Sequence, residues 1–249
     1  MRAVAGQNTQ ISRSTHGIAY DEVRDVFMIP NMYGQAIMFF RGDATGDVAP
    51  VRIIQGPRTR LKSPAKLAFD SLHNEVFVPD ANKLLVFSGT ANGDVAPLRV
   101  LEGPDTVQGG SVGVDPLNNL ILMVGGAGQG RSRVIVYDRT ANGNVKPKGI
   151  ITGPNSEMKG TQGPPAVYPP KKLIIIGMYG PGELGTPDSY FGVWSYAKYG
   201  DVPPIWKFGG PNQLVRQPRG ATVIPAHKSI VVTDKRVNAV ITWYFPEMF

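Results

Sequence analysis

One sequence segment is repeated along this chain, and this repetition constrains the fold more than any other feature. Its clearest part is residues 42–59 (GDATGDVAPVRIIQGPRT), which return as residues 89–106 (GTANGDVAPLRVLEGPDT) and 139–156 (RTANGNVKPKGIITGPNS). A more divergent copy covers residues 198–213, and residues 2–11 match the end of a further copy. A chain built in this way folds as a series of similar structural units.

Each copy contains four short apolar runs that are separated by turn residues. In the second copy these runs are residues 66–70 (KLAFD), 75–80 (EVFVPD), 83–88 (KLLVFS) and 98–103 (LRVLEG). They have the length of strands and are rich in valine, leucine, isoleucine and phenylalanine. The links between them carry aspartate, asparagine, glycine and proline, which favour turns. Apolar residues never recur at helical spacing over three turns, so the whole chain is predicted to be strand and turn.

Four strands per repeat, at a period of 40 to 50 residues, are typical of a β-propeller. The fifth copy ends after its third run, at residues 241–245, whereas residues 2–5 supply an unmatched fourth run. We therefore predict an all-β fold, a five-bladed β-propeller with four-stranded antiparallel blades. Pairing of the N-terminal strand with the last blade closes this predicted ring and leaves no long sheet edge open. The alternative is a fragment of a larger propeller that has lost a sixth blade.

The repeat frame predicts one domain over residues 1–249. Its blades are expected at residues 12–57, 58–104, 105–154, 155–211, and 212–249 together with 1–6. The copies differ most in two places. Residues 126–133 (GAGQGRSR) are predicted to form a long flexible loop, and residues 178–190 (MYGPGELGTPDSY) form an insertion in the fourth copy.

Composition limits the chemistry and the partners of the chain. The 249 residues include no cysteine, which excludes disulfides, thiolate metal sites and thiol nucleophiles. The formal net charge is +7, which favours anionic partners such as acidic glycans, carboxylate ligands or nucleic acid. No apolar run reaches the ~18 residues of a membrane helix. Met1 directly precedes a predicted strand, so we expect that a natural precursor carries a leader that is removed. This predicts a secreted or periplasmic protein.

The string VPDANKLLVFSGTANGDVAP (residues 78–97) resembles the NHL-repeat family. In those repeats an apolar strand is followed by a turn with Asp and Asn and then by a strand that ends in Val-Phe. Asp80, Asn82, Val86 and Phe87 fit this pattern, although the turn is shorter than usual. The resemblance implies a propeller related to gluconolactonase-like and strictosidine-synthase-like enzymes, to the amidating lyase of peptide hormones, and to non-catalytic domains that bind RNA or protein. Most such rings have six or more blades, so a count of five departs from the family.

The predicted binding face is the end of the propeller where two sets of loops meet. One set joins each blade to the next, and the other joins the second and third strands of each blade. Arginine and lysine outnumber acidic residues in these loops, so an anionic ligand is favoured there. We select as the predicted ligand-binding residues His16, Lys66, Arg131, Tyr179, Arg219 and Arg236.

The sequence predicts no metal and no cofactor. A gluconolactonase-like calcium site needs acidic and amide oxygens at the starts of the first strands. Those positions hold His16, Ala65, Gly110, Gly163 and Arg219 instead. A zinc site needs several histidines, but His73 and His227 fall in turns at the end opposite to His16.

No catalytic residue is assigned. His16 alone could act as a general base, but a single histidine at the start of a strand is typical of packing. Ser111 lacks the context of a nucleophile elbow. Asp21, Asp70 and Asp115 share one repeated position and are interpreted as turn starters. Five aromatic residues are expected in the core, namely Trp194, Tyr196, Trp206, Trp243 and Tyr244.

These observations favour a monomeric NHL-like propeller that binds an anionic small molecule, glycan or protein as a binding or scaffold module. One alternative is a lactonase- or lyase-like enzyme with its site at the channel mouth. A second alternative is an RNA-binding propeller, whose affinity would fall steeply with salt.

Overall fold

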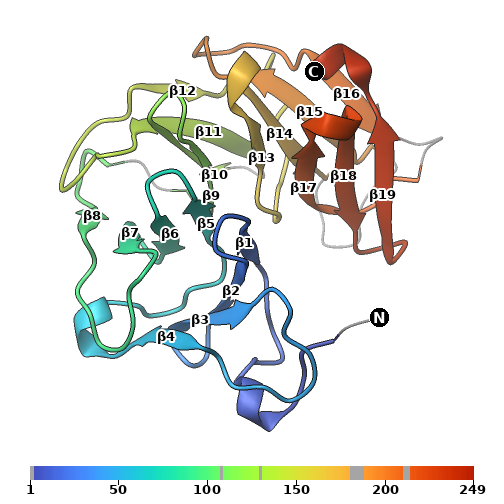
Figure 1. The fold of residues 1–249 in the computed structure, drawn as a ribbon. Helices are drawn as coiled ribbons and strands as arrows, with labels where there is room; N and C mark the ends of the chain where they lie inside the picture. Colours follow the sequence, from blue (N-terminus) through green and yellow to red (C-terminus); the bar gives the residue numbers. More distant parts are fainter. Residues whose placement is uncertain (1–2, 107–108, 129–130, 180–187, 210–213) are drawn as a thin grey trace. The chain divides into compact units, whose positions relative to one another are not determined.

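A computed structural model describes residues 3–106, 109–128, 131–179, 188–209 and 214–249, with the backbone alone at residues 127 and 128. Strands and turns make up nearly all of it (Figure 1). The helical elements are single 3₁₀ turns at Gln7–Thr9, Pro57–Thr59, Pro169–Lys171, Pro225–His227 and Pro246–Met248. None of the helices in this part of the chain has the length and apolar character required to cross a bilayer.

The strands form five antiparallel sheets, and the fold is the predicted five-bladed β-propeller. The first sheet contains β1 (Ala19–Asp21), β2 (Val26–Asn31), β3 (Ala36–Arg41) and β4 (Arg52–Gln55). The second contains β5 (Ala68–Asp70), β6 (Glu75–Asp80), β7 (Lys83–Ser88) and β8 (Arg99–Leu101). The third contains β9 (Ser111–Asp115), β10 (Leu120–Gly128), β11 (Arg131–Asp138) and β12 (Gly149–Ile151). The fourth contains β13 (Ala166–Tyr168), β14 (Leu173–Met178), β15 (Tyr190–Ser195) and β16 (Trp206–Gly209), and the fifth contains β17 (Pro218–Ile224), β18 (Ser229–Asp234) and β19 (Ala239–Tyr244).

The described part of the fifth sheet has three strands, β17, β18 and β19. The N-terminal segment that is predicted to be its fourth strand forms a parallel bridge between Val4 and Gly46 of the first sheet's β3–β4 loop. The Ala5 amide donates to the Gly46 carbonyl at 3.1 Å, and the Gly46 amide donates to the Ala3 carbonyl at 2.7 Å. The backbone groups of residues 3 and 5 are therefore satisfied by the first sheet.

The same parallel bridge joins fourth strands to the sheet that follows them. Ile54 of β4 bridges Gly93, Leu101 of β8 bridges Gly143, and Ile151 of β12 bridges Gly200. Each of these glycines has a positive φ, between 73° and 89°, which a residue with a side chain rarely adopts. The repeated GD or GN dipeptide is thus a structural device that links consecutive sheets.

The Asp or Asn that follows each of these glycines strengthens the link. The Asp94 carboxylate accepts a hydrogen bond from the Arg58 amide at 2.7 Å, and the Asp201 carboxylate accepts one from the Ser156 amide at 2.9 Å. Asp47 and Asn144 accept equivalent bonds from Asn8 and Asp105. Each such side chain therefore caps the 3₁₀ turn or loop that follows the fourth strand of the preceding repeat.

The turn that joins the first and second strands also follows the prediction. Asp21 accepts hydrogen bonds from the Val23 and Arg24 amides, Asp70 from the His73 amide, and Asp115 from the Asn118 amide. The three aspartates are buried (2% exposed or less). Their carboxylates are therefore occupied by the turns that they start.

Two compact units are distinguished within the chain. Unit 1 comprises residues 1–108 and 140–146, and unit 2 comprises residues 109–139 and 147–249. The core of unit 1 lies between its two sheets and includes Met28, Phe39, Val76 and Phe87. Unit 2 has one apolar cluster between its third and fourth sheets and a second between its fourth and fifth.

Two further expectations are corrected. The predicted loop at residues 126–133 is largely strand, because β10 and β11 form a long hairpin in which Gly125 pairs with Arg133 and Gly126 with Ser132. Glycine at these positions allows close strand pairing with a bulge. Among the five aromatic residues expected in the core, Trp194 and Tyr196 are fully buried, and Trp206 and Trp243 are partly buried. Tyr244 is 71% exposed, because it ends its strand at the register position that holds the polar residues Arg41, Ser88, Asp138 and Ser195 in the other sheets.

A buried tyrosine links the third and fourth sheets and leads to a prediction about pH. The Tyr196 hydroxyl donates to Asp115 at 2.7 Å, and burial together with this hydrogen bond raises the pKa of Tyr196. The folded protein therefore keeps this proton above pH ~10, where the phenol of the unfolded chain ionises. The stability that it contributes is complete below pH ~10 and declines as the pH rises further. We expect Tyr196→Phe to be less stable than wild type at pH 8 by about 1 kcal/mol, and the gap to narrow toward pH 11. Urea unfolding of both proteins measures this gap, and one that stays constant would contradict the prediction.

Candidate binding face

The loops that precede the first strand and those that join the second and third strands lie at one end of each sheet, called here the loop end. In the fourth sheet the Tyr179 amide donates to the Gly160 carbonyl at 2.9 Å, and the two residues form an antiparallel bridge. In the fifth sheet the Lys235 amide donates to the Gln217 carbonyl at 3.0 Å. The two sets of loops are therefore joined by backbone hydrogen bonds, as expected from the repeat.

An aspartate at the end of the second strand organises the loop end in two sheets. Asp234 is 2% exposed, and its Oδ2 accepts hydrogen bonds from the Arg216 and Gln217 amides, both at 2.7 Å. Its Oδ1 accepts from the Arg236 and Val237 amides at 2.9 and 3.2 Å. Asp80 similarly accepts from the Lys62 and Ser63 amides. These two carboxylates hold loops in place.

The other three sheets have different residues at this position. Asn31 donates to the Gln10 carbonyl and accepts from the Gly34 amide, so it holds the same two loops through an amide side chain. Gly125 allows the preceding loop to approach closely, because a Cβ placed there would lie 2.6 Å from the Gly109 Cα. At Met178 the Lys159 amide contacts Sδ at 3.3 Å. The loop ends of the third and fourth sheets are thus built differently from the others.

The six predicted ligand-binding residues are divided between the two units, with two in unit 1. His16 is exposed, and its Nε2 lies 3.2 Å from the Ser14 hydroxyl. Lys66 is half-buried, and its Cα would lie 3.1 Å from a Cβ placed on Gly17. The first-strand starts of the two sheets are therefore close together in unit 1, as the repeat predicts.

The other four predicted residues lie in unit 2. Arg219 is half-buried in β17, where a Cβ on Gly163 would lie 1.4 Å from its carbonyl oxygen. Arg236 is exposed in the β18–β19 hairpin, which Asp234 ties to the loop before Arg219. Tyr179 is half-buried beside Gly160, and Arg131 is exposed at the start of β11. The structure therefore brings Arg219 and Arg236 to the same loop end. Residues 180–187 of the predicted insertion lie outside the described residues.

Basic side chains predominate at the loop ends. In unit 1 they are Arg13, Arg58, Arg60, Lys62, Lys66 and Lys83, and in unit 2 they are Arg131, Lys159, Arg216, Arg219, Lys235 and Arg236. Four acidic side chains beside them have partners. Glu102 is paired with Arg60 at 2.8 Å and Glu157 with Lys207 at 2.7 Å, while Asp80 and Asp234 bind backbone amides.

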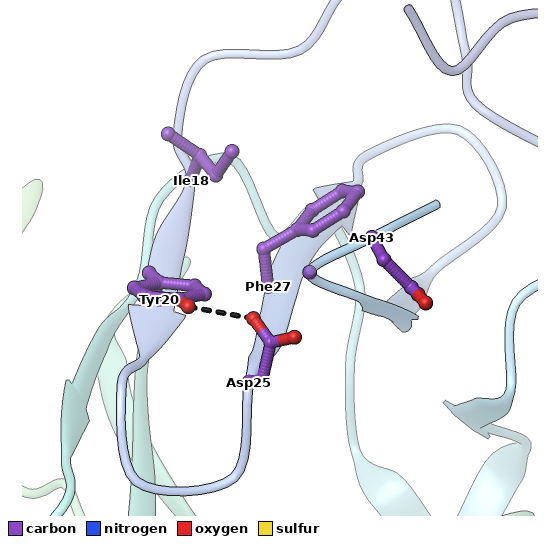
Figure 2. Close-up of a pocket in the computed structure, with 6 residues that line it drawn as sticks. Ile18, Tyr20, Asp25, Phe27 and Asp43 are labelled. Atoms are coloured by element: carbon purple, nitrogen blue, oxygen red, sulfur yellow. Dashed lines mark hydrogen bonds between the residues drawn. The ribbon is translucent and has the colours of Figure 1, made fainter. Parts of the chain in front are cut away.

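A second feature, which the sequence did not reveal, is a pocket of about 430 Å³ on the first sheet. Figure 2 shows Ile18, Tyr20, Phe27, Asp25 and Asp43 around it. The Tyr20 hydroxyl donates to Asp25 Oδ1 at 2.6 Å, which raises the pKa of this tyrosine. The repeat held a signal for the pocket, because Ile18 and Phe27 correspond to Leu67 and Val76 of the second copy, which are buried in the core of unit 1. To recognise this signal in the sequence, one must know which face of the sheet each strand position occupies.

The described residues contain no group of three or more His, Asp or Glu side chains that is placed to hold a metal ion. Their carboxylates mostly bind backbone amides or pair with single basic residues. The loop ends therefore offer cations and backbone groups, and the pocket offers aromatic rings and two carboxylates.

No protein-family model matches the chain, and no curated protein matches it in sequence. Similarity is found in solved structures. Hydrazine synthase from Kuenenia stuttgartiensis aligns with a TM-score of 0.61 and 11% identity over 94% of this chain and 57% of that chain. A chain of the mitotic checkpoint complex aligns with a TM-score of 0.59 and 15% identity, over 91% of this chain and 62% of that one.

A chain of the nidogen/laminin complex aligns with a TM-score of 0.63 and 16% identity, over 91% of this chain and 74% of that one. Our chain thus spans less than two thirds of the first two structures. At these identities the similarity concerns the fold, and it supports the β-propeller.

Proposed function

We propose that this chain is a binding module whose loop ends recognise an anionic partner. The observation that supports the proposal is the excess of basic side chains at the loop ends of both units, where Glu102, Glu157, Asp80 and Asp234 are already paired. Because positive charge is in excess at these loops, a partner that brings negative charge is favoured.

The exposed arginines suit carboxylate, sulfate or phosphate groups. Arg131 and Arg236 are both exposed, and a guanidinium group can donate two parallel hydrogen bonds to such an anion. The Asp234 hydrogen bonds fix the backbone from which Arg236 projects, so less conformational freedom is lost on binding. We infer an acidic glycan, an anionic small molecule or an acidic protein surface as the partner class. Such a partner agrees with the secreted or periplasmic location and the NHL-like character expected from the sequence.

Charge reversal at the loop end tests this proposal. We expect Arg131→Glu and Arg236→Glu each to weaken binding to a sulfated polysaccharide, such as heparin, by about fivefold at 0.1 M salt. Lys198→Glu is the matched control, because Lys198 is also exposed but follows β15 at the opposite end of the fourth sheet. Titration calorimetry of the three variants and the wild type measures the effect.

An equal loss in Lys198→Glu would show that only the net charge matters, and would overturn the assignment to the loop end. Absence of heparin binding by the wild type, together with no binding to a panel of carboxylate and phosphate ligands, would contradict the anionic preference itself. Tighter binding to a single-stranded oligonucleotide of the same charge would favour the RNA-binding alternative.

A further inference from the structure

Two Asn-Gly dipeptides lie in loops that bridge consecutive sheets, and this dipeptide occurs nowhere else in the chain. Asn92 and Gly93 belong to the β7–β8 loop, and Asn142 and Gly143 belong to the β11–β12 loop. The backbone amide of a glycine can attack the side-chain carboxamide of a preceding asparagine with little hindrance, because glycine has no Cβ. Each dipeptide therefore contains both reacting groups of a deamidation.

The bridge between Ile54 and Gly93 engages both groups of the first dipeptide. The Gly93 amide donates to the Ile53 carbonyl at 2.6 Å, and Asn92 Oδ1 accepts from the Ile53 amide at 3.1 Å. The Gly93 carbonyl in turn accepts from the Gln55 amide at 3.1 Å. The backbone of β4 thus holds, by hydrogen bonds, the two groups that would otherwise react with each other.

The second dipeptide repeats this arrangement. The Gly143 amide donates to the Val100 carbonyl at 2.7 Å, and Asn142 Oδ1 accepts from the Val100 amide at 3.0 Å. The Gly143 carbonyl accepts from the Glu102 amide at 3.2 Å. Residues 140–146 group with unit 1, so both bridges lie within this unit. The geometry is therefore a property of the Asn-Gly dipeptide in this loop and not of a single copy.

Two further bridges of the same kind have other residues before the glycine. Thr45 precedes Gly46, and Tyr199 precedes Gly200. The amides of both glycines still donate to a backbone carbonyl, at 2.7 Å in each case. The bridge therefore forms without asparagine, and asparagine adds a second hydrogen bond and a reactive carboxamide.

We propose that Asn92 and Asn142 are sites of spontaneous deamidation, and that opening of the bridge between sheets controls the reaction. In the open loop the Gly93 nitrogen gives its proton to hydroxide and bonds to Asn92 Cγ. The carboxamide nitrogen takes up a proton from water and leaves as ammonia, which closes a succinimide ring. Water then adds to one of the two ring carbonyls and breaks its bond to nitrogen, so the product is aspartate or isoaspartate. Asn142 and Gly143 react in the same way.

The closed bridge slows this reaction for two reasons. The Gly93 proton is held by the Ile53 carbonyl, which is too weak a base to remove it. The Asn92 carboxamide is held by the Ile53 amide, so Cγ is not free to turn toward the Gly93 nitrogen. Both hydrogen bonds must break before the new bond forms, and local opening of this kind occurs without global unfolding. The rate of deamidation should therefore follow the population of the open bridge.

The two products differ in their effect on the bridge. Aspartate at position 92 keeps an oxygen where Asn92 Oδ1 accepts from the Ile53 amide. Isoaspartate adds one carbon atom to the backbone before Gly93 and shifts the peptide that follows. The Gly93 amide and carbonyl then no longer reach Ile53 and Gln55 together. Isoaspartate should thus keep the bridge open and remove the hydrogen bonds that link the first and second sheets.

Peptide mass spectrometry of protein incubated in mildly alkaline buffer tests the proposal. Both asparagines should deamidate in the folded protein at least about tenfold more slowly than in protein unfolded in guanidinium chloride. Asp94→Ala removes the carboxylate that accepts the Arg58 amide beside the first bridge. This variant should deamidate at Asn92 about threefold or more faster than wild type when folded, and at the same rate when unfolded. Asn142 is the control within the same molecule, and its rate should not change.

Asn92→Thr copies the residue of the first sheet's loop and is the matched control, because it should stay folded and lose only the modification at position 92. Hydrogen exchange should show a loss of protection at the Ile53 and Gly93 amides in the isoaspartate product but not in Asn92→Asp. Equal rates in folded and unfolded wild type would overturn the control by the bridge, as would equal acceleration at both asparagines in Asp94→Ala. A folded protein that stays unmodified after the unfolded protein has reacted completely would overturn the assignment of the two sites.

Discussion

Replacing Trp194 with alanine is expected to lower the free energy of unfolding by about 3–5 kcal/mol. Trp194 is fully buried in the cluster between the third and fourth sheets, and its Nε1 donates to the Ser156 carbonyl at 3.0 Å. Truncation leaves a cavity and an unsatisfied buried carbonyl. Because Ser156 lies in the loop that leads to the loop end of the fourth sheet, order in that loop should also decrease. Urea unfolding monitored by circular dichroism gives the stability, and hydrogen exchange gives the order of the loop.

Two variants separate the packing of Trp194 from its hydrogen bond. Trp194→Phe keeps most of the apolar volume but loses the donor, so we expect a smaller loss of stability than in the alanine variant. Gly192→Ala leaves the indole in place but puts a Cβ 2.2 Å from its Cη2 atom, so it should also destabilise the protein through a clash. A Trp194→Ala protein with the stability of wild type would show that the ring is not part of a packed core.

Replacing Asp234 with alanine is expected to cost about 3 kcal/mol, because four backbone amides lose the carboxylate that accepts their hydrogen bonds. The loops that this carboxylate joins carry Arg216, Arg219 and Arg236, so the variant should also bind heparin more weakly than wild type. Thermal unfolding and calorimetric titration measure the two effects on one preparation.

Asp234→Asn is the informative control. The amide keeps one acceptor oxygen and the size of the side chain, so the loss should be smaller than for alanine. Asp201→Ala removes a carboxylate that accepts bonds from Ser156 and Asn155 outside the loop-end contacts of the fifth sheet. It should lower stability without a selective effect on heparin affinity. Equal loss of affinity in Asp201→Ala and Asp234→Ala would contradict a specific function for the loops around Asp234.

Much of the fold could be predicted from the sequence, because the signals are local and repeated. Residues 75–80 and 83–88 were predicted as strands and are β6 and β7. The aspartates at positions 21, 70 and 115 were interpreted as turn starters and accept the expected amide hydrogen bonds. Alternation of apolar residues and turn chemistry acts over a few residues, so one copy of the repeat contains the information for one sheet.

Features that depend on neighbours in space could not be predicted in this way. Tyr244 and Tyr196 were both expected in the core, yet only Tyr196 is buried. The strand register explains the difference, because Phe245 and not Tyr244 occupies the position of Tyr196: the Phe245 amide donates to the Lys228 carbonyl as the Tyr196 amide donates to the Lys172 carbonyl. Glycine-rich residues 126–133 suggested a loop, but pairing along the hairpin extends the strands.

For the candidate site, the sequence predicted only which residues lie in the loops at the loop end. The sequence placed His16, Lys66, Arg219 and Arg236 at loop ends, and the structure shows neighbouring strand starts close together in each unit. The sequence did not indicate that the Asp234 carboxylate accepts backbone hydrogen bonds. Because of these bonds, Asp234 is not available to bind a ligand. Whether a loop residue faces a partner or holds the backbone depends on distances of about 3 Å, which spacing in sequence does not determine.

The bridges between fourth strands and the following glycines have a consequence for how this architecture can be divided. A fourth strand pairs with its own sheet and also bonds to a loop that belongs, in sequence, to the next repeat. Residues 140–146 illustrate this, because they group with unit 1 although they lie between strands of the third sheet. Modules joined by such a bridge therefore overlap, and a single cut between them leaves unpaired backbone on both sides. Recombination that exchanges modules would preserve the most contacts if each module carried its neighbour's glycine-aspartate turn with it.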